Sequence, residues 1–115
     1  MLGAIIGDIV GSRFEFTQFK SKDFELFGDG CDFTDDTICT VATADWLLRD
    51  GELAEYNYAN ILKEWCNKFP HPTGGFGNRF SQWLIGKEKI PYGSYGNGSA
   101  MRVAPVGWHF DSLIE

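Results

Sequence analysis

The sequence has little positive charge and no cluster of it. Ten lysines and arginines stand against sixteen aspartates and glutamates, which gives a formal net charge of −6. Because no basic run offers a binding track for a phosphate backbone, nucleic acid is disfavoured as a partner. The acidic surface is better suited to cations or to a basic patch on another protein.

Cysteines are also few, and their spacing does not suit metal or disulfide chemistry. Cys31, Cys39 and Cys66 are odd in number and form no C-x-x-C pair, so neither a disulfide framework nor a zinc site is indicated. We expect reduced thiols in a cytoplasmic protein. The apolar opening MLGAIIGDIVG is short, has no basic region and is interrupted by Asp8, which disfavours a signal peptide or a membrane span.

The apolar residues that are present predict a helical domain. They make up 43% of the 115 residues, which is enough for one domain with a modest core. Helical spacing predicts helices over residues 2–12, 34–48, 53–68 and 79–85, and a brief helix that stops before Pro105. Strand is the competing interpretation for residues 2–12, which we expect to form a buried helix with Gly3, Gly7 and Gly11 on one face. The expected fold is all-α with long functional loops.

The stretch FTDDT, residues 33–37, places two carboxylates at the start of a predicted helix. Aspartate and threonine are favoured there because they cap free N–H groups and suit the helix dipole. Their oxygens are also the ligands that Mg²⁺ and Ca²⁺ prefer. Adjacent helical residues project about 100° apart, so Asp35 and Asp36 suit two neighbouring ions better than one.

Asp8 and Glu15 are further candidate carboxylates. Asp8 interrupts an apolar segment, where an acid is rarely fully buried without a partner; a metal site and a hydrogen-bonded capping role both remain open for it. Glu15 is equally compatible with a solvated loop. The only histidines, His71 and His109, do not lie near a nucleophile-elbow pattern, so Ser-His-Asp catalysis has little support.

Two glycine-rich segments, GGFG at 74–77 and GSYGNGSAMR at 93–102, precede predicted helices. Glycines let backbone N–H groups approach an anion, and a helix N-terminus adds positive potential, so the second segment could hold a phosphate-bearing ligand. It is neither a Walker A loop nor a G-x-G-x-x-G turn, and a plain tight turn is the alternative. Tyr95 or Phe76 could stack on a base or ribose, or serve in packing.

Three segments, in this order, resemble the ADP-ribosylglycohydrolase family, also called the dinitrogenase-reductase-activating glycohydrolase family. GAIIGDIVGSRFE resembles its opening helix, FTDDT its first metal motif and SYGNGSAMRVAP its ligand loop, while GGFG is a looser match. The resemblance spans essentially the whole chain. It implies an all-α fold and hydrolysis of the glycosidic bond that joins ADP-ribose to a protein side chain or a related acceptor.

The resemblance also implies roles for individual residues. In the family two Mg²⁺ ions lie at the ribose of the substrate, and Thr34, Asp35 and Asp36 would be metal ligands here. Glu15, Asp35 and Asp36 would be the catalytic acids, with Glu15 able to gate the site. Residues of the two glycine-rich segments would hold ADP-ribose: Phe76, Gly77, Ser94, Tyr95, Gly96, Asn97 and Gly98.

One departure from the family is large. Members are typically more than twice this length and carry a second metal motif, close to D-x-D-T/S, near their C-terminus. The acids after Asp50 form no such motif; they are Glu52, Glu55, Glu64, Glu88, Asp111 and Glu115. We therefore expect residues 1–115 to form a single, partial domain, the N-terminal part of the fold. It would belong to a hydrolase that is inactive as this chain alone, or act as a non-catalytic binding module, such as an inhibitor or antitoxin. An all-α fold that is cut short leaves apolar helix faces without partners, and exposed patches of this kind mark an interface or cause association. We therefore expect a homo-oligomer or an obligate protein partner, with helices 2–12 and 34–48 near the contact.

Overall fold

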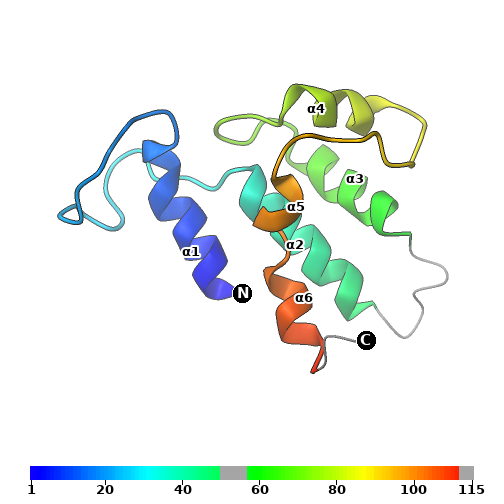
Figure 1. Ribbon diagram of the computed structural model, residues 1–115, viewed down its shortest axis with the longest axis horizontal. Helices are drawn as coiled ribbons and strands as arrows, with labels where there is room; N and C mark the ends of the chain where they lie inside the picture. The colour runs from blue at the N-terminus through cyan, green and yellow to red at the C-terminus, as the bar shows by residue number, and fades with distance from the viewer. Residues whose placement is uncertain (50–56, 112–115) are drawn as a thin grey trace.

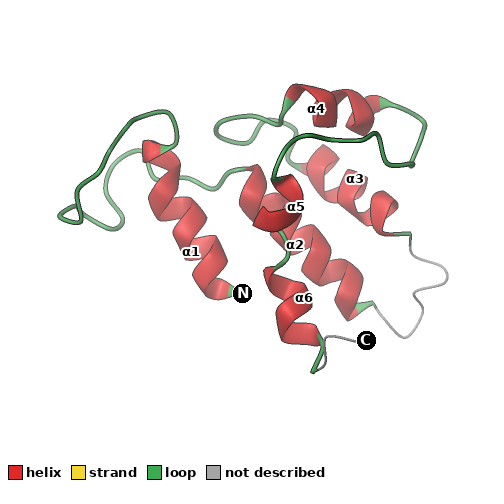
Figure 2. Ribbon diagram, in the orientation of Figure 1, coloured by secondary structure: helices red, strands yellow, loops and turns green. Residues whose placement is uncertain are grey.

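The computed structural model describes residues 1–49 and 57–111. Helical elements follow one another along this part of the chain: α1 (Leu2–Gly11), the 3-10 turn η1 (Ser12–Phe14), α2 (Asp35–Leu48), α3 (Tyr58–Lys68), α4 (Asn78–Ile85), α5 (Gly98–Met101) and α6 (Ala104–His109). No strand occurs within these ranges, where β-type pairing is limited to an isolated parallel bridge between Thr34 and Thr73. The all-α prediction is confirmed, as Figure 2 shows.

Helix α2 is the element around which the other helices are arranged (Figure 1). Helices α1, α3, α5 and α6 all pack against it, and α4 packs on α3. A buried apolar cluster joins α2, α3 and α4 and consists of Ile38, Cys39, Ala42, Leu62, Cys66 and Leu84. Because burial of apolar surface is the main favourable term in folding, this cluster fixes the positions of the helices that carry the loops.

The ends of α2 and α3 follow from local sequence. The Thr34 hydroxyl caps α2 by accepting a hydrogen bond from the Asp36 N–H at 3.2 Å, and the Asn57 side chain caps α3 by accepting one from the Ala59 N–H at 2.8 Å. Such caps satisfy N–H groups that the first turn leaves unpaired. The predicted range of α2 is right. The predicted start of the next helix at residue 53 lies outside the described residues.

Helix α1 forms over nearly its predicted range, but the prediction that it is buried is wrong. Val10 is its one buried residue, whereas Leu2 is 72% exposed and Ile6 is 49% exposed. The reason is that, among the described elements, α1 packs chiefly on α2 and on the following 3-10 turn. No helix of residues 1–49 and 57–111, α1 included, is long and apolar enough to cross a membrane.

Helix α6 was not predicted. The sequence indicated a brief helix ending before Pro105, and α5 does end at Met101. Pro105, however, lies in the first turn of a further helix, α6. Proline is tolerated there because the N–H group that it lacks would have had no intrahelical partner.

The cysteines Cys31, Cys39 and Cys66 are free thiols in this structure. Cys39 and Cys66 are buried where α2 meets α3. A hydrogen bond between their thiols lowers the pKa of Cys39 and raises the pKa of Cys66. Both thiols therefore act as core side chains of this helix pair.

Candidate functional site

The carboxylate of Asp8 joins α1 to the N-terminus of α2. Its Oδ1 accepts a hydrogen bond from the Thr34 hydroxyl at 2.6 Å, and its Oδ2 accepts from the Thr37 hydroxyl at 2.5 Å. Oδ2 also accepts from the backbone N–H groups of Thr34 and Thr37, at 2.9 and 3.2 Å. A carboxylate in this place satisfies free N–H groups and suits the positive end of the helix dipole. Of the two roles left open for Asp8, this structure shows the hydrogen-bonded one.

The orientation of the Thr34 hydroxyl follows from these bonds. Thr34 is buried, donates its hydroxyl proton to Asp8 and accepts from the Asp36 N–H. A hydroxyl has one proton and two lone pairs. Asp8 and Asp36 therefore leave the oxygen of Thr34 with one lone pair that a cation could use.

Asp35 and Asp36 lie in the first turn of α2 and are partly buried. Burial is the main cause that raises the pKa of Asp35 to about 6, and the charges of Asp36, Glu15 and Asp8 raise it further. Burial and then the charge of Asp8 raise the pKa of Asp36. The structure thus brings these four acids close enough for their charges to act on one another, an arrangement that a bound cation stabilises.

Glu15 lies against the GGFG segment. Its Oε2 is 2.8 Å from the position that a β-carbon on Gly74 would occupy. Gly74 also has φ +81°, a left-handed conformation that favours glycine. A side chain at position 74 would therefore be strained and would displace the Glu15 carboxylate.

Two further contacts attach the GGFG segment to the metal motif. Thr73 donates its hydroxyl proton to the Asp32 carboxylate at 2.7 Å, and it pairs with Thr34 in the isolated parallel bridge. Residues 73–77 consequently lie beside the start of α2, which Figure 1 also shows. The sequence reasoning missed Asp32 and Thr73, since neither residue forms a recognisable motif.

The second glycine-rich segment is attached to α4 by Arg79. Its guanidinium donates hydrogen bonds to the backbone carbonyls of Tyr92 and Gly93, at 2.8 and 3.2 Å. Thr40 of α2 donates to the carbonyl of Met101 at 3.2 Å, which places α5 about one helical turn beyond the acidic pair. Sequence reasoning missed Arg79; its one signal was a basic residue in the helix that follows a glycine-rich segment.

The predicted ADP-ribose residues fall into two groups. Phe76 packs against the core, edge to face with Phe80 at a centroid distance of 5.7 Å, and Gly77 is the N-cap of α4. Residues 94–97 are exposed, including Tyr95 at 98%, and Gly98 begins α5. A hollow of about 370 Å³ opens beside this segment; its lining includes Tyr58, Phe80, Trp83, Tyr92, Ser94 and Arg102.

The FTDDT segment presents oxygen atoms that could form part of a metal coordination shell. Thr34, Asp35 and Asp36 offer oxygen atoms, the ligands that fit a hard cation such as Mg²⁺. Within residues 1–49 and 57–111, no three His, Cys, Asp or Glu side chains form a group that could hold a metal ion. Since Mg²⁺ prefers an octahedral shell of six oxygens, the residues fit one side of a metal site and leave the other side to water, substrate or further ligands.

Comparison with known proteins gives the same family throughout. A family model described as ADP-ribosylglycohydrolase matches residues 1–114. A protein of Acanthamoeba polyphaga mimivirus named as an ADP-ribosyl glycohydrolase is 30% identical over 125 residues, which cover 90% of this chain and 38% of that protein. The ADP-ribosylarginine hydrolase of Pseudomonas putida is 32% identical over 125 residues, which cover 92% of this chain and 34% of the relative.

The chain therefore spans little more than a third of the length of either relative. No solved structure matches it. The family model nevertheless covers nearly every residue. Two of the three segments that resembled the family, GAIIGDIVGSRFE and FTDDT, meet at the start of α2 through Asp8 and Thr34, and the third contacts α2 further along, where Thr40 donates to the carbonyl of Met101. This chain belongs to the ADP-ribosylglycohydrolase family.

Proposed function

We propose that this chain supplies one half of an ADP-ribosylglycohydrolase site, which binds ADP-ribose and takes part in hydrolysing its bond to a protein side chain or related acceptor. The observation that carries the proposal is the set of four hydrogen bonds from Thr34 and Thr37 to Asp8. These bonds fix the start of α2, so that Asp35 lies close enough to Glu15 for the two charges to interact. Glu15 in turn lies against Gly74 of the GGFG segment.

In this proposal Thr34, Asp35 and Asp36 hold Mg²⁺ through their oxygens. The ion, when bound, orients a water molecule and lowers its pKa. Glu15 is exposed at the edge of the acidic cluster, against Gly74, and gates access to it. The sugar of the substrate then lies between the acidic cluster and the two glycine-rich segments.

The glycine-rich segments hold the remainder of ADP-ribose. The exposed residues Ser94, Gly96 and Asn97, with Gly98 at the start of α5, cradle the two phosphates through backbone N–H groups. The Gly96 N–H donates to the Ser94 hydroxyl at 3.1 Å in the free chain, so a phosphate oxygen would replace that hydroxyl as its acceptor. Tyr95, whose ring is exposed, and Phe76 with Gly77 lie at the edge of the ligand. Arg79 keeps the segment in place through the carbonyls of Tyr92 and Gly93.

Residues 1–115 are proposed to be one partial domain that does not catalyse hydrolysis by itself. Three side-chain ligands, Thr34, Asp35 and Asp36, fall short of what two Mg²⁺ ions require, because each ion prefers six oxygens and gives up water reluctantly. A second set of acidic ligands must come from additional polypeptide. The natural substrate class, taken from the name of the Pseudomonas putida relative, is ADP-ribosylated arginine.

A non-catalytic binding module is the second candidate function. The exposed segment 94–97 and the incomplete ligand set favour it. Such a module would bind ADP-ribose or a protein partner as an inhibitor or antitoxin, and hydrolysis would not appear under any combination of partners and metal.

Ligand mapping and an activity assay test the two candidates. With millimolar ADP-ribose we expect chemical-shift changes at Gly96 and Asn97. If their signals did not move, the proposed role of the second glycine-rich segment in binding ADP-ribose would be refuted. Hydrolysis is measured on a protein that carries ADP-ribosylated arginine, with and without Mg²⁺. Each measurement is repeated with and without the part of the Pseudomonas putida relative that this chain does not cover. Hydrolysis that needs both Mg²⁺ and the added polypeptide supports the proposal that this chain supplies one half of the active site. Binding of ADP-ribose without hydrolysis supports the binding module.

A further inference from the structure

Helix α1 has an apolar sequence on every side. Its ten residues, LGAIIGDIVG, include one polar side chain, that of Asp8. The Asp8 carboxylate is already hydrogen-bonded to Thr34 and Thr37. A helix that is apolar all round is typical of a position inside a protein. In the described structure, however, Leu2 and Ile6 are largely exposed.

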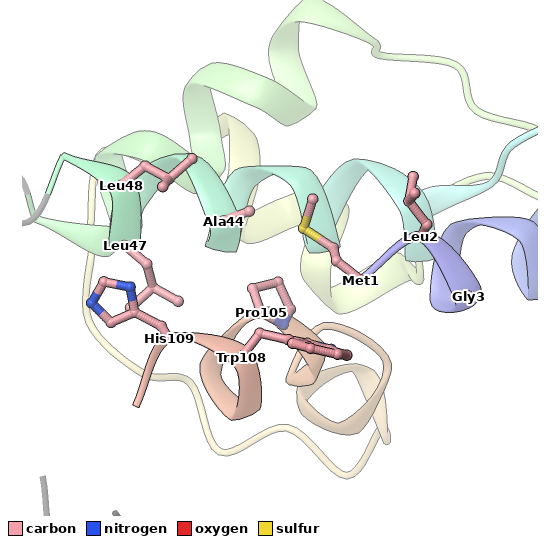
Figure 3. Close-up of a pocket in the computed structure, with 9 residues that line it drawn as sticks. All are labelled: Met1, Leu2, Gly3, Ala44, Leu47, Leu48, Pro105, Trp108 and His109. Atoms are coloured by element: carbon pink, nitrogen blue, oxygen red, sulfur yellow. The ribbon is translucent and has the colours of Figure 1, made fainter. Parts of the chain in front are cut away.

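An apolar groove continues from α1 onto the helices beside it. Residues from the N-terminal end of α1, the C-terminal half of α2 and α6 line an open pocket, as Figure 3 shows. Its volume is about 570 Å³. Its lining is mostly apolar, with His109 as the polar residue, and includes Met1, Leu2, Ala44, Leu47, Pro105 and Trp108. Trp108 is 80% exposed. Contiguous exposed apolar surface of this kind marks an interaction site.

The glycines of α1 indicate what shape of partner fits. A β-carbon added to Gly3, Gly7 or Gly11 would have no heavy atom within 4 Å. Glycine costs a helix about 1 kcal/mol relative to alanine, and its advantage is close approach of another backbone. A helix that packs its backbone against this face would use that advantage. Leu2 and Ile6 project about 100° around α1 from Gly3 and Gly7, so they would flank that contact.

We propose that the surface formed by α1, the C-terminal half of α2 and α6 docks a helical polypeptide equivalent to the part of the relatives that this chain does not cover. Both relatives are single proteins of the same family, and this chain covers 38% and 34% of them. Their remaining length is more than enough to cover the groove. A second copy of this chain is the poorer occupant, because two chains with a net charge of −6 repel each other.

This inference rests on the proposed function, because the same polypeptide would bring the missing acidic ligands. It is tested without reference to catalysis. The chain is mixed with the uncovered part of the mimivirus relative, and separately with that of the Pseudomonas putida relative. Light scattering then gives the stoichiometry, and hydrogen exchange gives the protection of the α1 backbone. We expect a one-to-one complex in which the amides of α1 exchange more slowly than in the chain alone.

Variants of this chain locate the contact. Gly7→Leu should leave the chain folded, because the space at Gly7 is open and leucine is the better helix former. The leucine side chain should nevertheless block close approach of a partner helix and weaken docking about tenfold or more. Trp108→Ser should weaken docking to a similar extent. Ile85→Ser is the matched control and should leave docking unchanged. Ile85 is 86% exposed at the end of α4, and no residue of α4 lines the groove.

Three results would overturn the inference. One is no complex with the uncovered part of either relative; another is a complex that Gly7→Leu and Trp108→Ser leave unaffected. The third is a dimer of the chain alone that Gly7→Leu disrupts, which would make a second copy the occupant. A Gly7-sensitive complex that does not hydrolyse ADP-ribosylarginine protein would instead support the docking surface and refute the proposed function.

Discussion

The Oδ2 atom of Asp8 lies 2.5 Å from the hydroxyl oxygen of Thr37, across the junction between α1 and α2. A short hydrogen bond to a carboxylate is about twice as strong as one between neutral groups. The same carboxylate also accepts hydrogen bonds from the backbone N–H and the hydroxyl of Thr34. Asp8 therefore fixes the position of the first turn of α2, and both of its carboxylate oxygens accept hydrogen bonds from Thr34 and Thr37.

Replacing Asp8 should destabilise the chain strongly. Asp8→Ala leaves the hydroxyl and N–H groups of Thr34 and Thr37 without their acceptor, and we expect a loss of about 2–3 kcal/mol in the free energy of unfolding. Asp8→Asn should cost less, because the amide keeps one acceptor oxygen. Denaturant unfolding measures both. Asp29→Ala, at an exposed loop acid, should change stability by no more than about 0.5 kcal/mol; similar losses at positions 8 and 29 would contradict the assigned role.

The sequence predicted the elements of this site better than their contacts. Helical periodicity and caps located α2, because Thr34 and the two acids after it form a local pattern. The pairing of Thr73 with Thr34 and the approach of Gly74 to Glu15 depend on how separate segments pack. No local pattern encodes such contacts.

The exposure of α1 could not be predicted for a different reason. Its apolar residues favour burial, and sequence alone gives that preference without saying which surface satisfies it. In the described structure α2 covers one side of α1, and Leu2 and Ile6 on its other sides stay exposed. The preference and the observed exposure are reconciled if another polypeptide covers α1.

The raised pKa of Asp35 predicts a pH dependence of stability in metal-free protein. The folded-state pKa is about 6 against an ordinary value of 3.8, so the folded state binds this proton more tightly than the unfolded state does. The contribution of Asp35 to the free energy of unfolding is therefore fully present below about pH 4 and is lost as the pH rises through 6. In chelator, Asp35→Asn should stabilise the protein at pH 7 by about 1–2 kcal/mol, after allowance for solvent screening, and by nothing measurable near pH 3.5.

Asp45 is a control, because its pKa is shifted in the opposite direction to that of Asp35. Hydrogen bonds from Arg49 and then Trp65 lower the pKa of its carboxyl, although burial opposes them. The charged form is therefore favoured in the folded state, and Asp45→Asn should destabilise the protein at pH 7. If both substitutions shifted the melting temperature in the same direction, the assigned electrostatics at Asp35 would be wrong.

Alanine at Gly74 and at Gly75 should separate backbone strain from displacement of Glu15. Both glycines have positive φ, +81° and +74°, so each substitution should cost about 1–2 kcal/mol of stability. A β-carbon at 74 meets the Glu15 carboxylate, whereas one at 75 has nothing within 4 Å. The Glu15 side-chain NMR signals should therefore move in Gly74→Ala alone. Equal shifts in the two variants would contradict the contact.

Arg79→Gln should weaken ADP-ribose binding if Arg79 positions the ligand segment. The substitution removes a charged donor from the carbonyls of Tyr92 and Gly93, and loss of about 1 kcal/mol corresponds to roughly a fivefold rise in Kd. Calorimetry measures the change. Lys22→Gln, on an exposed loop, alters net charge equally and should leave Kd unchanged, so equal weakening by both variants would mean that charge alone matters.

The most demanding prediction is that hydrolysis requires this chain, Mg²⁺ and a second acidic ligand set together. Thr34, Asp35 and Asp36 alone cannot complete the oxygen shells of two ions, so the attacking water would lack orientation and activation. Loss of a well-placed catalytic group commonly costs a factor of about 10² or more. The purified chain should therefore show negligible turnover of ADP-ribosylarginine protein, and addition of the uncovered part of the Pseudomonas putida relative should restore it. Asp35→Ala in this chain should abolish the restored turnover, whereas Asp29→Ala should not. Robust Mg²⁺-dependent turnover by the 115 residues alone would refute the half-site, because one set of acidic ligands would then suffice.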